Sequence, residues 1–245
     1  MTVNLRAKNK PTLLRILRSI DIEGPLLSGS LNKEYTESYA MAHLLSSLVE
    51  KCDRLIFPLK VVHRTDRGGK PDFLLTLNEK NIGIEHTDAR SMNETRKDVL
   101  RRKEKIGPPT YLMTHAEPNE PRRNANQLRK EIESNARDAG WGDQDRTDQD
   151  WSRVMLCFID KKVRKLQAPD FSRFDEDWLL IRDAWRFPSV NLQNATKHLF
   201  SKIKNQGINL EFHRVFIISC SDRGPVCEIA ESGFRLHPRN DLWLQ

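Results

Sequence analysis

Two acidic residues, Asp72 and Glu85, stand where a pair of carboxylates can hold a metal ion. Asp72 comes directly before the apolar run 73–77, and Glu85 directly follows the apolar run 82–84. Carboxylate oxygens are the ligands that Mg²⁺ prefers, and one or two carboxylates are enough to anchor the ion. A bound Mg²⁺ can activate water for hydrolysis. The pair therefore indicates a metal site with hydrolytic potential.

The polar residues 78–81 join the two apolar runs and have the composition of a tight turn. Two apolar runs joined in this way predict a β-hairpin. A turn centred between residues 79 and 80 places Asp72 opposite Thr87. Because side chains alternate along a strand, Asp72, Glu85 and Thr87 then share one face. Asp72 and Glu85 lie on a diagonal of about 7–8 Å, close enough to share one metal ion, provided that the turn has an even length.

A proline before Asp72, followed after the turn by Glu85, His86 and Thr87, resembles the core motif of the PD-(D/E)XK nuclease superfamily. The resemblance covers about residues 31–105. It implies a restriction-endonuclease-like fold and hydrolysis of phosphodiester bonds in DNA. It also implies that Asp72 and Glu85 bind Mg²⁺ or Mn²⁺ and that the His86 carbonyl is a further ligand.

The motif departs from the family where a lysine normally follows the glutamate by two positions, because Thr87 stands there. Threonine cannot supply the positive charge that helps to activate water, and three explanations stay open. Lys60 on the preceding strand or Lys97 on the following helix takes over the role. Alternatively, the metal alone activates water and Thr87 orients it. In the third case the chain is a degenerate nuclease that binds without cutting.

The segment from 32 to about 52 predicts a helix whose apolar residues recur at spacings of three and four. Extended backward, this stripe includes Glu37, four residues before Met41, and passes near Glu34. An acid on the inward face of a helix is unusual unless it has a role, and the resemblance implies a metal-linked glutamate on such a helix. Glu37 is the expected additional ligand, with Glu34 in reserve. The alternative is that both acids lie at a solvated helix end.

The chain is basic, with 41 Lys and Arg residues against 34 Asp and Glu residues and a formal net charge of +7. A positive balance suits a nucleic-acid partner, because neutralising phosphates supplies most non-specific affinity. DNA is the expected partner, and RNA stays open. Residues 93–105 predict a basic helix that either lines a phosphate path or is a solvated face. The expected phosphate contacts are Arg90, Arg96, Arg101, Arg102 and Lys103.

The order of helical and strand patterns predicts a single α/β domain over 1–245, with a mixed β-sheet flanked by helices. Its core is expected at about 31–105 and 151–245. Four prolines and a polar helical pattern mark about 107–150 as a polar, mostly helical insertion. Such a segment either covers a substrate cleft or is a mobile excursion.

No apolar run approaches the roughly 18 residues of a membrane span. The four cysteines are far apart and lack metal-ligand spacing, which favours a cytoplasmic protein with reduced thiols. The oligomeric state is open, with a homodimer as one option. The hypothesis is a metal-dependent hydrolase, an endonuclease acting on DNA. Its rivals are a non-catalytic nucleic-acid or partner-binding module with this fold, and an unrelated α/β protein.

Overall fold

The computed structural model describes residues 3–20, 33–51, 55–64, 69–107, 116–134, 143–185, 187, 189–219, 224–238 and 242. In these ranges eight strands form one sheet, and six helices accompany it. The strands are β1 (Leu5–Ala7), β2 (Leu59–His63), β3 (Phe73–Leu77), β4 (Lys80–Ala89), β5 (Glu176–Asp183), β6 (Arg214–Ser219), β7 (Val226–Ala230) and β8 (Gly233–His237). The helices are α1 (Lys10–Ser19), α2 (Lys33–Lys51), α3 (Met92–Glu104), α4 (Ala125–Ser134), α5 (Gln144–Leu166) and α6 (Leu192–Asn205).

The strands lie in the sheet in the same order as in the chain. β1 to β4 are antiparallel neighbours, β4, β5 and β6 run parallel, and β6 to β8 are again antiparallel. The parallel connections are the long ones that carry helices, as parallel pairing requires. The predicted α/β class with a mixed sheet is confirmed.

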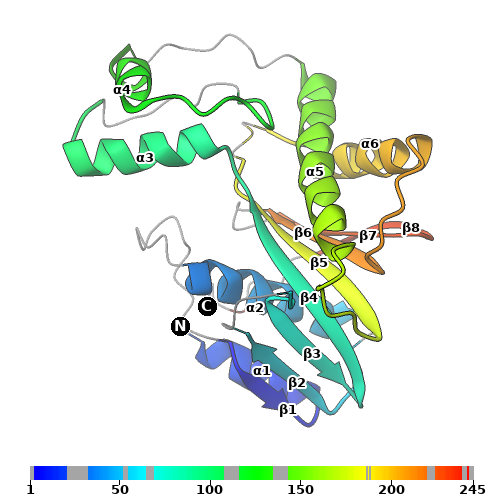
Figure 1. The fold of residues 1–245 in the computed structure, drawn as a ribbon. Helices are drawn as coiled ribbons and strands as arrows, with labels where there is room; N and C mark the ends of the chain where they lie inside the picture. The colour runs from blue at the N-terminus through cyan, green and yellow to red at the C-terminus, as the bar shows by residue number, and fades with distance from the viewer. Residues whose placement is uncertain are drawn as a thin grey trace.

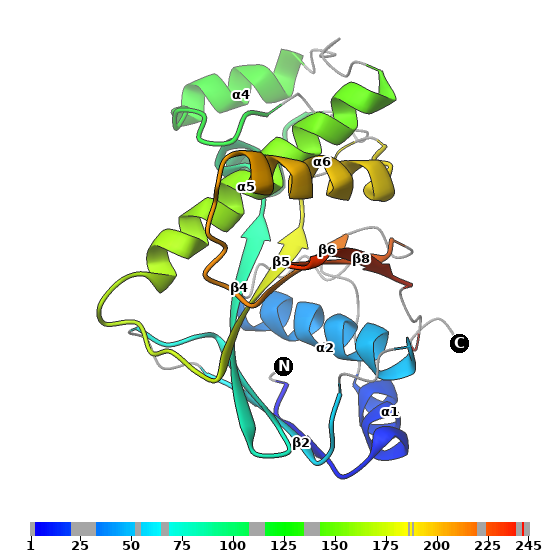
Figure 2. The same cartoon turned by 90° about the vertical axis from the view of Figure 1, so that its right-hand side faces the viewer.

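Helices cover both faces of the sheet (Figures 1 and 2). α1 and α2 pack on one face, where their leucines form a core with the apolar residues of β2, β3 and β4. α5 and α6 pack on the other face, over apolar residues of β5, β6 and β7. Alternation along β4 sends Ile84 to the α2 face and Ala89 to the α5 face. Glu85, four residues before Ala89, therefore belongs to the α5 face.

The hairpin between β3 and β4 exists, but its predicted turn centre was wrong. Leu77 pairs with Lys80, so only Asn78 and Glu79 form the turn. Both have positive φ, 44° and 75°, as a two-residue type I′ turn requires. The register pairs Phe73 with Ile84, and one further step sets Asp72 beside Glu85 rather than Thr87. The partner of Asp72 thus differs from the predicted one by two residues. Because side chains alternate along a strand, Asp72, Glu85 and Thr87 still share one face.

One strand was not predicted, and one helix begins earlier than the predicted core. β1 pairs antiparallel with β2, although the basic N-terminal segment gave no strand pattern. α5 begins at Gln144, inside the expected insertion, because the Asp143 side chain caps it by accepting from the Arg146 N–H. Its first turns are polar yet packed, with Asp148 and Trp151 fully buried.

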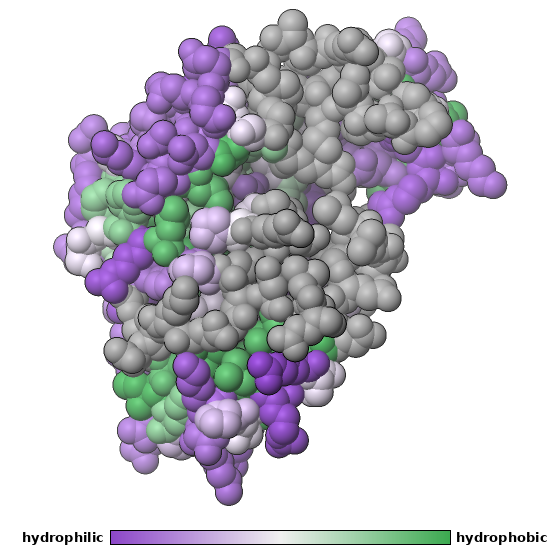
Figure 3. Space-filling model, turned by 180° about the vertical axis from the view of Figure 1, so that it is seen from behind, coloured by the Kyte–Doolittle hydropathy of each residue, from purple (hydrophilic) through white to green (hydrophobic). Residues whose placement is uncertain are grey.

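α3 and α4 form an arm beyond the carboxyl end of β4 (Figure 1). Ser91 caps α3 by accepting from the Glu94 N–H. α4 buries Leu128 and Ile132. Seen from behind, the coloured residues at this projecting end are mostly hydrophilic (Figure 3). The expectation of a polar helical segment is confirmed for α4, whereas residues 108–115 and 135–142 of that segment lie outside the described ranges.

Candidate active site

A pocket of about 270 Å³ lies beside β4, where β3 stops pairing with it. The last β3 pair joins Phe73 to Ile84, whereas β4 continues to Ala89 with β5 on its other edge. α2 and α5 contribute from opposite faces of the sheet (Figure 2). The pocket is lined by Lys33, Thr36, Asp72, Glu85, His86, Thr87, Asp88, Lys162 and Lys165.

Asp72 is held directly before β3 by the backbone of the neighbouring strand. Its Oδ2 accepts a hydrogen bond from the His86 backbone N–H at 2.8 Å, and its Oδ1 lies 3.3 Å from the Lys33 ammonium. Burial opposes ionisation, but the His86 N–H and the charges of Lys33 and Lys162 hold the pKa of Asp72 below its ordinary value. Asp72 is therefore a carboxylate at neutral pH.

Glu85 is almost fully buried, with 3% of its side chain exposed, and it lies between two lysines of α5. Its Oε1 accepts hydrogen bonds from Lys162 Nζ at 2.6 Å and from Lys165 Nζ. Its Oε2 is buried and has no hydrogen-bond partner in the described part of the chain. A buried oxygen without a donor is costly, and this atom can serve as a ligand for a cation.

α5 brings both lysines to Glu85 because residues three apart lie on one side of a helix. Lys162 also donates to the backbone carbonyl of His86 at 2.8 Å, so its ammonium joins two consecutive residues of β4. Ile159 and Val163 anchor the same stretch of α5 in the core that it shares with α6. The position of the lysines is thus fixed by packing.

Glu37 lies behind the pocket lining, on α2. Its Oε2 is 2.7 Å from Nε2 of His63 on β2, and its Oε1 is 3.0 Å from the Lys33 ammonium. Lys33, whose side chain is 78% exposed, therefore links Glu37 to Asp72. Glu34, the reserve candidate, is exposed in the first turn of α2. The structure places Glu37 next to the predicted metal site, separated from Asp72 by a lysine.

The two lysines expected to replace the motif lysine do not line the pocket. Lys60 is exposed on β2. Lys97 is buried on α3, where its ammonium lies 2.7 Å from Glu94 Oε1 and 2.8 Å from Glu131 Oε2. Thr87 does line the pocket. The lysines next to Glu85 come from α5 instead.

The basic residues expected to contact phosphates lie at or beyond the carboxyl end of β4 and do not line this pocket. Arg90 is 3.9 Å from Asp88 Oδ2. Arg96 donates to the backbone carbonyl of Arg123, in the segment before α4. The other three belong to the last turn of α3: Arg101, Arg102 and Lys103. Part of this basic surface is therefore engaged within the arm.

Asp88 and His86 form a further side of the pocket. Both oxygens of Asp88 accept hydrogen bonds from Arg182 of β5, each at 2.7 Å, and the Arg182 side chain is 2% exposed. Burial raises the pKa of Asp88, but the bonds and charge of Arg182 outweigh it and bring the pKa below its ordinary value. Burial lowers the pKa of the His86 imidazole despite the nearby carboxylates, which favours the neutral ring at pH 7.

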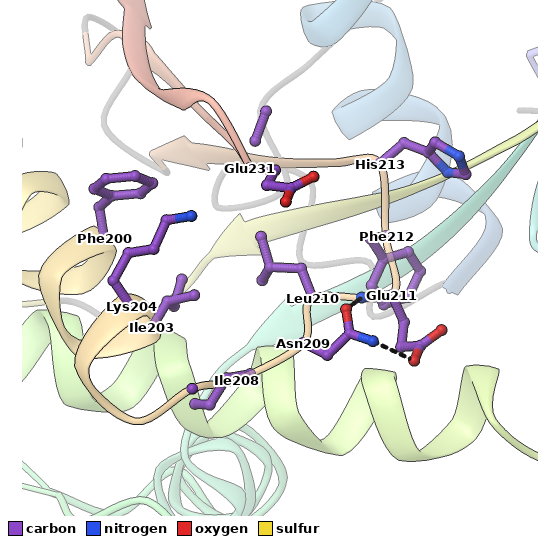
Figure 4. Close-up of a pocket in the computed structure, with 12 residues that line it drawn as sticks. Phe200, Ile203, Lys204, Ile208, Asn209, Leu210, Glu211, Phe212, His213 and Glu231 are labelled. Atoms are coloured by element: carbon purple, nitrogen blue, oxygen red, sulfur yellow. Dashed lines mark hydrogen bonds between the residues drawn. The ribbon is translucent and has the colours of Figure 1, made fainter.

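A larger pocket, of about 560 Å³, lies at the end of α6 (Figure 4). Its lining includes three buried apolar residues: Ile203, Leu210 and Phe212. Glu211 accepts a hydrogen bond from the Asn209 side chain at 2.8 Å. Figure 4 shows Lys204 and Glu211 on opposite sides of this pocket, with Glu231 between them.

Sequence reasoning identified Asp72, Glu85 and Thr87 but missed Lys33, Lys162 and Lys165 as parts of one site. The available signal was the basic run 161–165 at the end of a helical pattern. Such a run is also what the carboxyl end of any helix favours, because cations stabilise the helix dipole there. The sequence alone did not distinguish the two explanations.

The residues beside β4 fit a hydrated hard cation. Among the described residues, no three His, Cys, Asp or Glu side chains group closely enough to hold a metal ion alone. The candidate ligand oxygens are the carboxylates of Asp72 and Glu85 and the carbonyl of His86, which also accepts from Lys162. Both oxygens of Asp88, the third carboxylate of the lining, are bound by Arg182. Mg²⁺ keeps several waters and needs only one or two carboxylates. The orphaned Oε2 of Glu85 is consistent with such an ion.

Comparisons with known proteins identify no family for this chain. No family model, curated protein or solved structure matches it. None of the described helices is both long and apolar enough to cross a membrane. The function has to be inferred from the site itself.

Proposed function

We propose that this chain is a metal-dependent nuclease with a restriction-endonuclease-like core, acting on DNA. The observation that carries the proposal is the convergence of Asp72, Glu85 and the Lys162 ammonium in one pocket beside β4, past its last pair with β3. Two carboxylates on adjacent strands and a lysine beside them are the groups that metal-assisted phosphodiester hydrolysis uses.

Asp72, Glu85 and the His86 carbonyl would hold Mg²⁺ or Mn²⁺. When bound, the ion would neutralise phosphate charge and lower the pKa of a coordinated water. Glu85 can bind the α5 lysines and the metal ion together. Its Oε1 accepts from the lysines, while its Oε2 has no donor in the described residues. Glu37 would support the site indirectly, by orienting Lys33 next to Asp72.

Lys162 would take the role that Thr87 cannot fill. Its ammonium donates both to Glu85 and to the carbonyl of His86, so it lies against the segment that carries the motif. A lysine here can orient an attacking water and stabilise negative charge that develops on the phosphate. Thr87, which also lines the pocket, can contribute a hydroxyl to the same water.

A non-catalytic binding module is the second candidate, and one observation favours it. The pocket carboxylates are already matched by basic side chains: Asp72 by Lys33, Glu85 by Lys162 and Lys165, and Asp88 by Arg182. Internal neutralisation of this kind also suits a site that has lost its metal and kept its affinity for nucleic acid. Cleavage and binding must therefore be measured separately.

The decisive assay incubates plasmid, single-stranded DNA and RNA with the protein in Mg²⁺, in Mn²⁺ and in EDTA. Asp72→Asn and Glu85→Gln should each reduce metal-dependent cleavage by about 10²–10³-fold, because each removes an anionic ligand. Glu79→Gln, an exposed acid in the turn of the same hairpin, should cleave like wild type.

Two results would reject the nuclease proposal. If wild type cuts none of the substrates but binds them with salt-sensitive affinity, the binding module is the better account. If it neither cuts nor binds them, both proposals fail. Equal cleavage by wild type and both acid variants would move the active site elsewhere in the chain.

A further inference from the structure

The α5 side of the pocket carries more positive than negative charge. Lys162 and Lys165 both donate to the same atom, Glu85 Oε1. One carboxylate balances one ammonium, so this side holds a surplus cation at the edge of a buried site. The exposed fraction of the side chain rises from 3% for Glu85 to 19% for Lys162 and 47% for Lys165. The surplus charge therefore faces the mouth of the pocket.

On the α2 side, the Asp72 carboxylate lies 3.3 Å from the Lys33 ammonium. Lys33 is also 3.0 Å from Glu37, but Glu37 does not line the pocket and is itself 2.7 Å from His63 Nε2. One ammonium thus faces one pocket carboxylate on this side, whereas two ammoniums face Glu85 on the α5 side. An anionic ligand is therefore best matched by the α5 side.

We propose that Lys162 and Lys165 form a phosphate-binding subsite on α5, with Lys165 as its outer, substrate-contacting residue. The ligand is a polynucleotide phosphate, seated against α5 and opposite Asp72. This assignment adds a substrate orientation to the proposed nuclease function and rests on it for its catalytic meaning. Phosphate binding itself needs no cleavage. Lysine ammoniums are common phosphate ligands because they act as mobile point charges.

Lys165 differs from its basic neighbours in where its ammonium lies. It contacts Glu85 and lies 5.6 Å from the centroid of the Phe171 ring, which orients it at the pocket. The Lys161 ammonium lies over the Phe158 ring, at 5.2 Å from its centroid. A general interaction with the helix dipole would affect these two lysines alike. A phosphate subsite at the pocket would involve Lys165 and not Lys161.

The test measures binding of a short labelled DNA duplex to the full chain in EDTA, by fluorescence anisotropy over a series of salt concentrations. Lys165→Gln should weaken binding about fivefold, as loss of one exposed charge contact predicts. It should also lower the slope of log K against log salt by about one. Lys161→Gln, with the same change in net charge on the same helix, should stay within about twofold of wild type.

Equal weakening by the two variants would overturn the subsite, because net charge alone would then explain the effect. An unchanged Lys165→Gln, or a wild type that does not bind the duplex, would overturn it as well. The outcome is separable from the nuclease proposal. Selective weakening with an inactive wild type keeps the subsite and rejects the nuclease, whereas active wild type with an unchanged Lys165→Gln does the reverse.

Discussion

At the scale of single residues, the charges in this pocket are set by their neighbours. Burial alone would make Asp72 and Asp88 harder to ionise, yet nearby donors lower the pKa of both. For Asp72 the donors are the His86 backbone N–H and Lys33, and the charge of Lys162 adds to their effect. A cation or a substrate can displace or join these partners. For Asp88 the donor is the buried guanidinium of Arg182. Asp72 is therefore suited to exchange partners, and Asp88 to hold two strands together.

Asp88→Asn is expected to lower the free energy of unfolding by about 3 kcal/mol at pH 7, because it leaves the Arg182 charge buried without its carboxylate. The folded pKa of Asp88 is lowered, so its stabilisation is complete above the ordinary value of 3.8 and is lost as pH falls through the folded pKa. Urea unfolding at pH 7 and at a pH well below 3.8 should therefore show the difference between variant and wild type shrinking at the lower pH.

Asp160→Asn is the matched control, since Asp160 pairs with Arg164 at the surface, with side chains 41% and 76% exposed. Its effect should stay below about 0.5 kcal/mol at either pH. A variant at Asp88 that unfolds like wild type at pH 7 would show that the Arg182 pair is not a stabilising contact.

At the scale of elements, the site depends on a short hairpin and a long helix. The two-residue turn sets the register that places Asp72 beside Glu85. α5, capped at Asp143 and packed through Ile159 and Val163, then carries Lys162 across to β4. The hairpin supplies the carboxylates and the helix supplies the charge that the motif lacks.

Glu79→Gly is expected to stabilise the protein by about 1 kcal/mol. Glu79 has φ 75° at an exposed turn position, a left-handed conformation that glycine adopts without the steric cost of a Cβ atom. Thermal or urea unfolding measures the gain. Glu79→Ala removes the same carboxylate but keeps the Cβ atom, so it should not stabilise. If both variants behave alike, the gain does not come from the turn conformation.

The elements with strong patterns could be predicted, and those without could not. The β3–β4 hairpin and α2 follow from apolar runs and spacing. The turn centre was misplaced because Asn78 and Glu79 adopt left-handed φ without a glycine to signal it. The first turns of α5 were assigned to the polar insertion rather than to the core because their buried residues, such as Asp148, are polar. The conformation of these residues depends on tertiary packing, which the local sequence does not reveal.

At the scale of the whole molecule, the site forms beside β4, past its last pair with β3, where residues from the helices on both faces of the sheet line one pocket. α2 reaches the pocket from one face of the sheet and α5 from the other (Figure 2). Lys162 and Glu85 are 77 positions apart in the chain, so no local spacing links them. The sequence thus indicated the two carboxylates, which lie in one hairpin. Lys162 could be assigned to the site only from the three-dimensional structure.

The distribution of charge over the molecule also changes the expected substrate path. The predicted phosphate contacts on α3 belong to an arm in which Lys97 and Arg123 are paired with Glu131. The lysines at the pocket come from α5 instead. The chain carries a net charge of +7. If the proposed function holds, this charge would attract nucleic acid in general, and the α5 lysines would be the place where a phosphate binds.

The most direct test of this account is the rate of Mg²⁺-dependent DNA cleavage by Lys162→Gln, compared with Lys60→Gln and Lys97→Gln. Lys162→Gln should lose about 10²–10³-fold, since it removes the only proposed replacement for the motif lysine. Lys60→Gln should cleave like wild type. Lys97→Gln should lose activity only in proportion to the fraction of the variant that is unfolded. Full activity in Lys162→Gln, or a loss confined to either of the other two variants, would contradict the proposed centre.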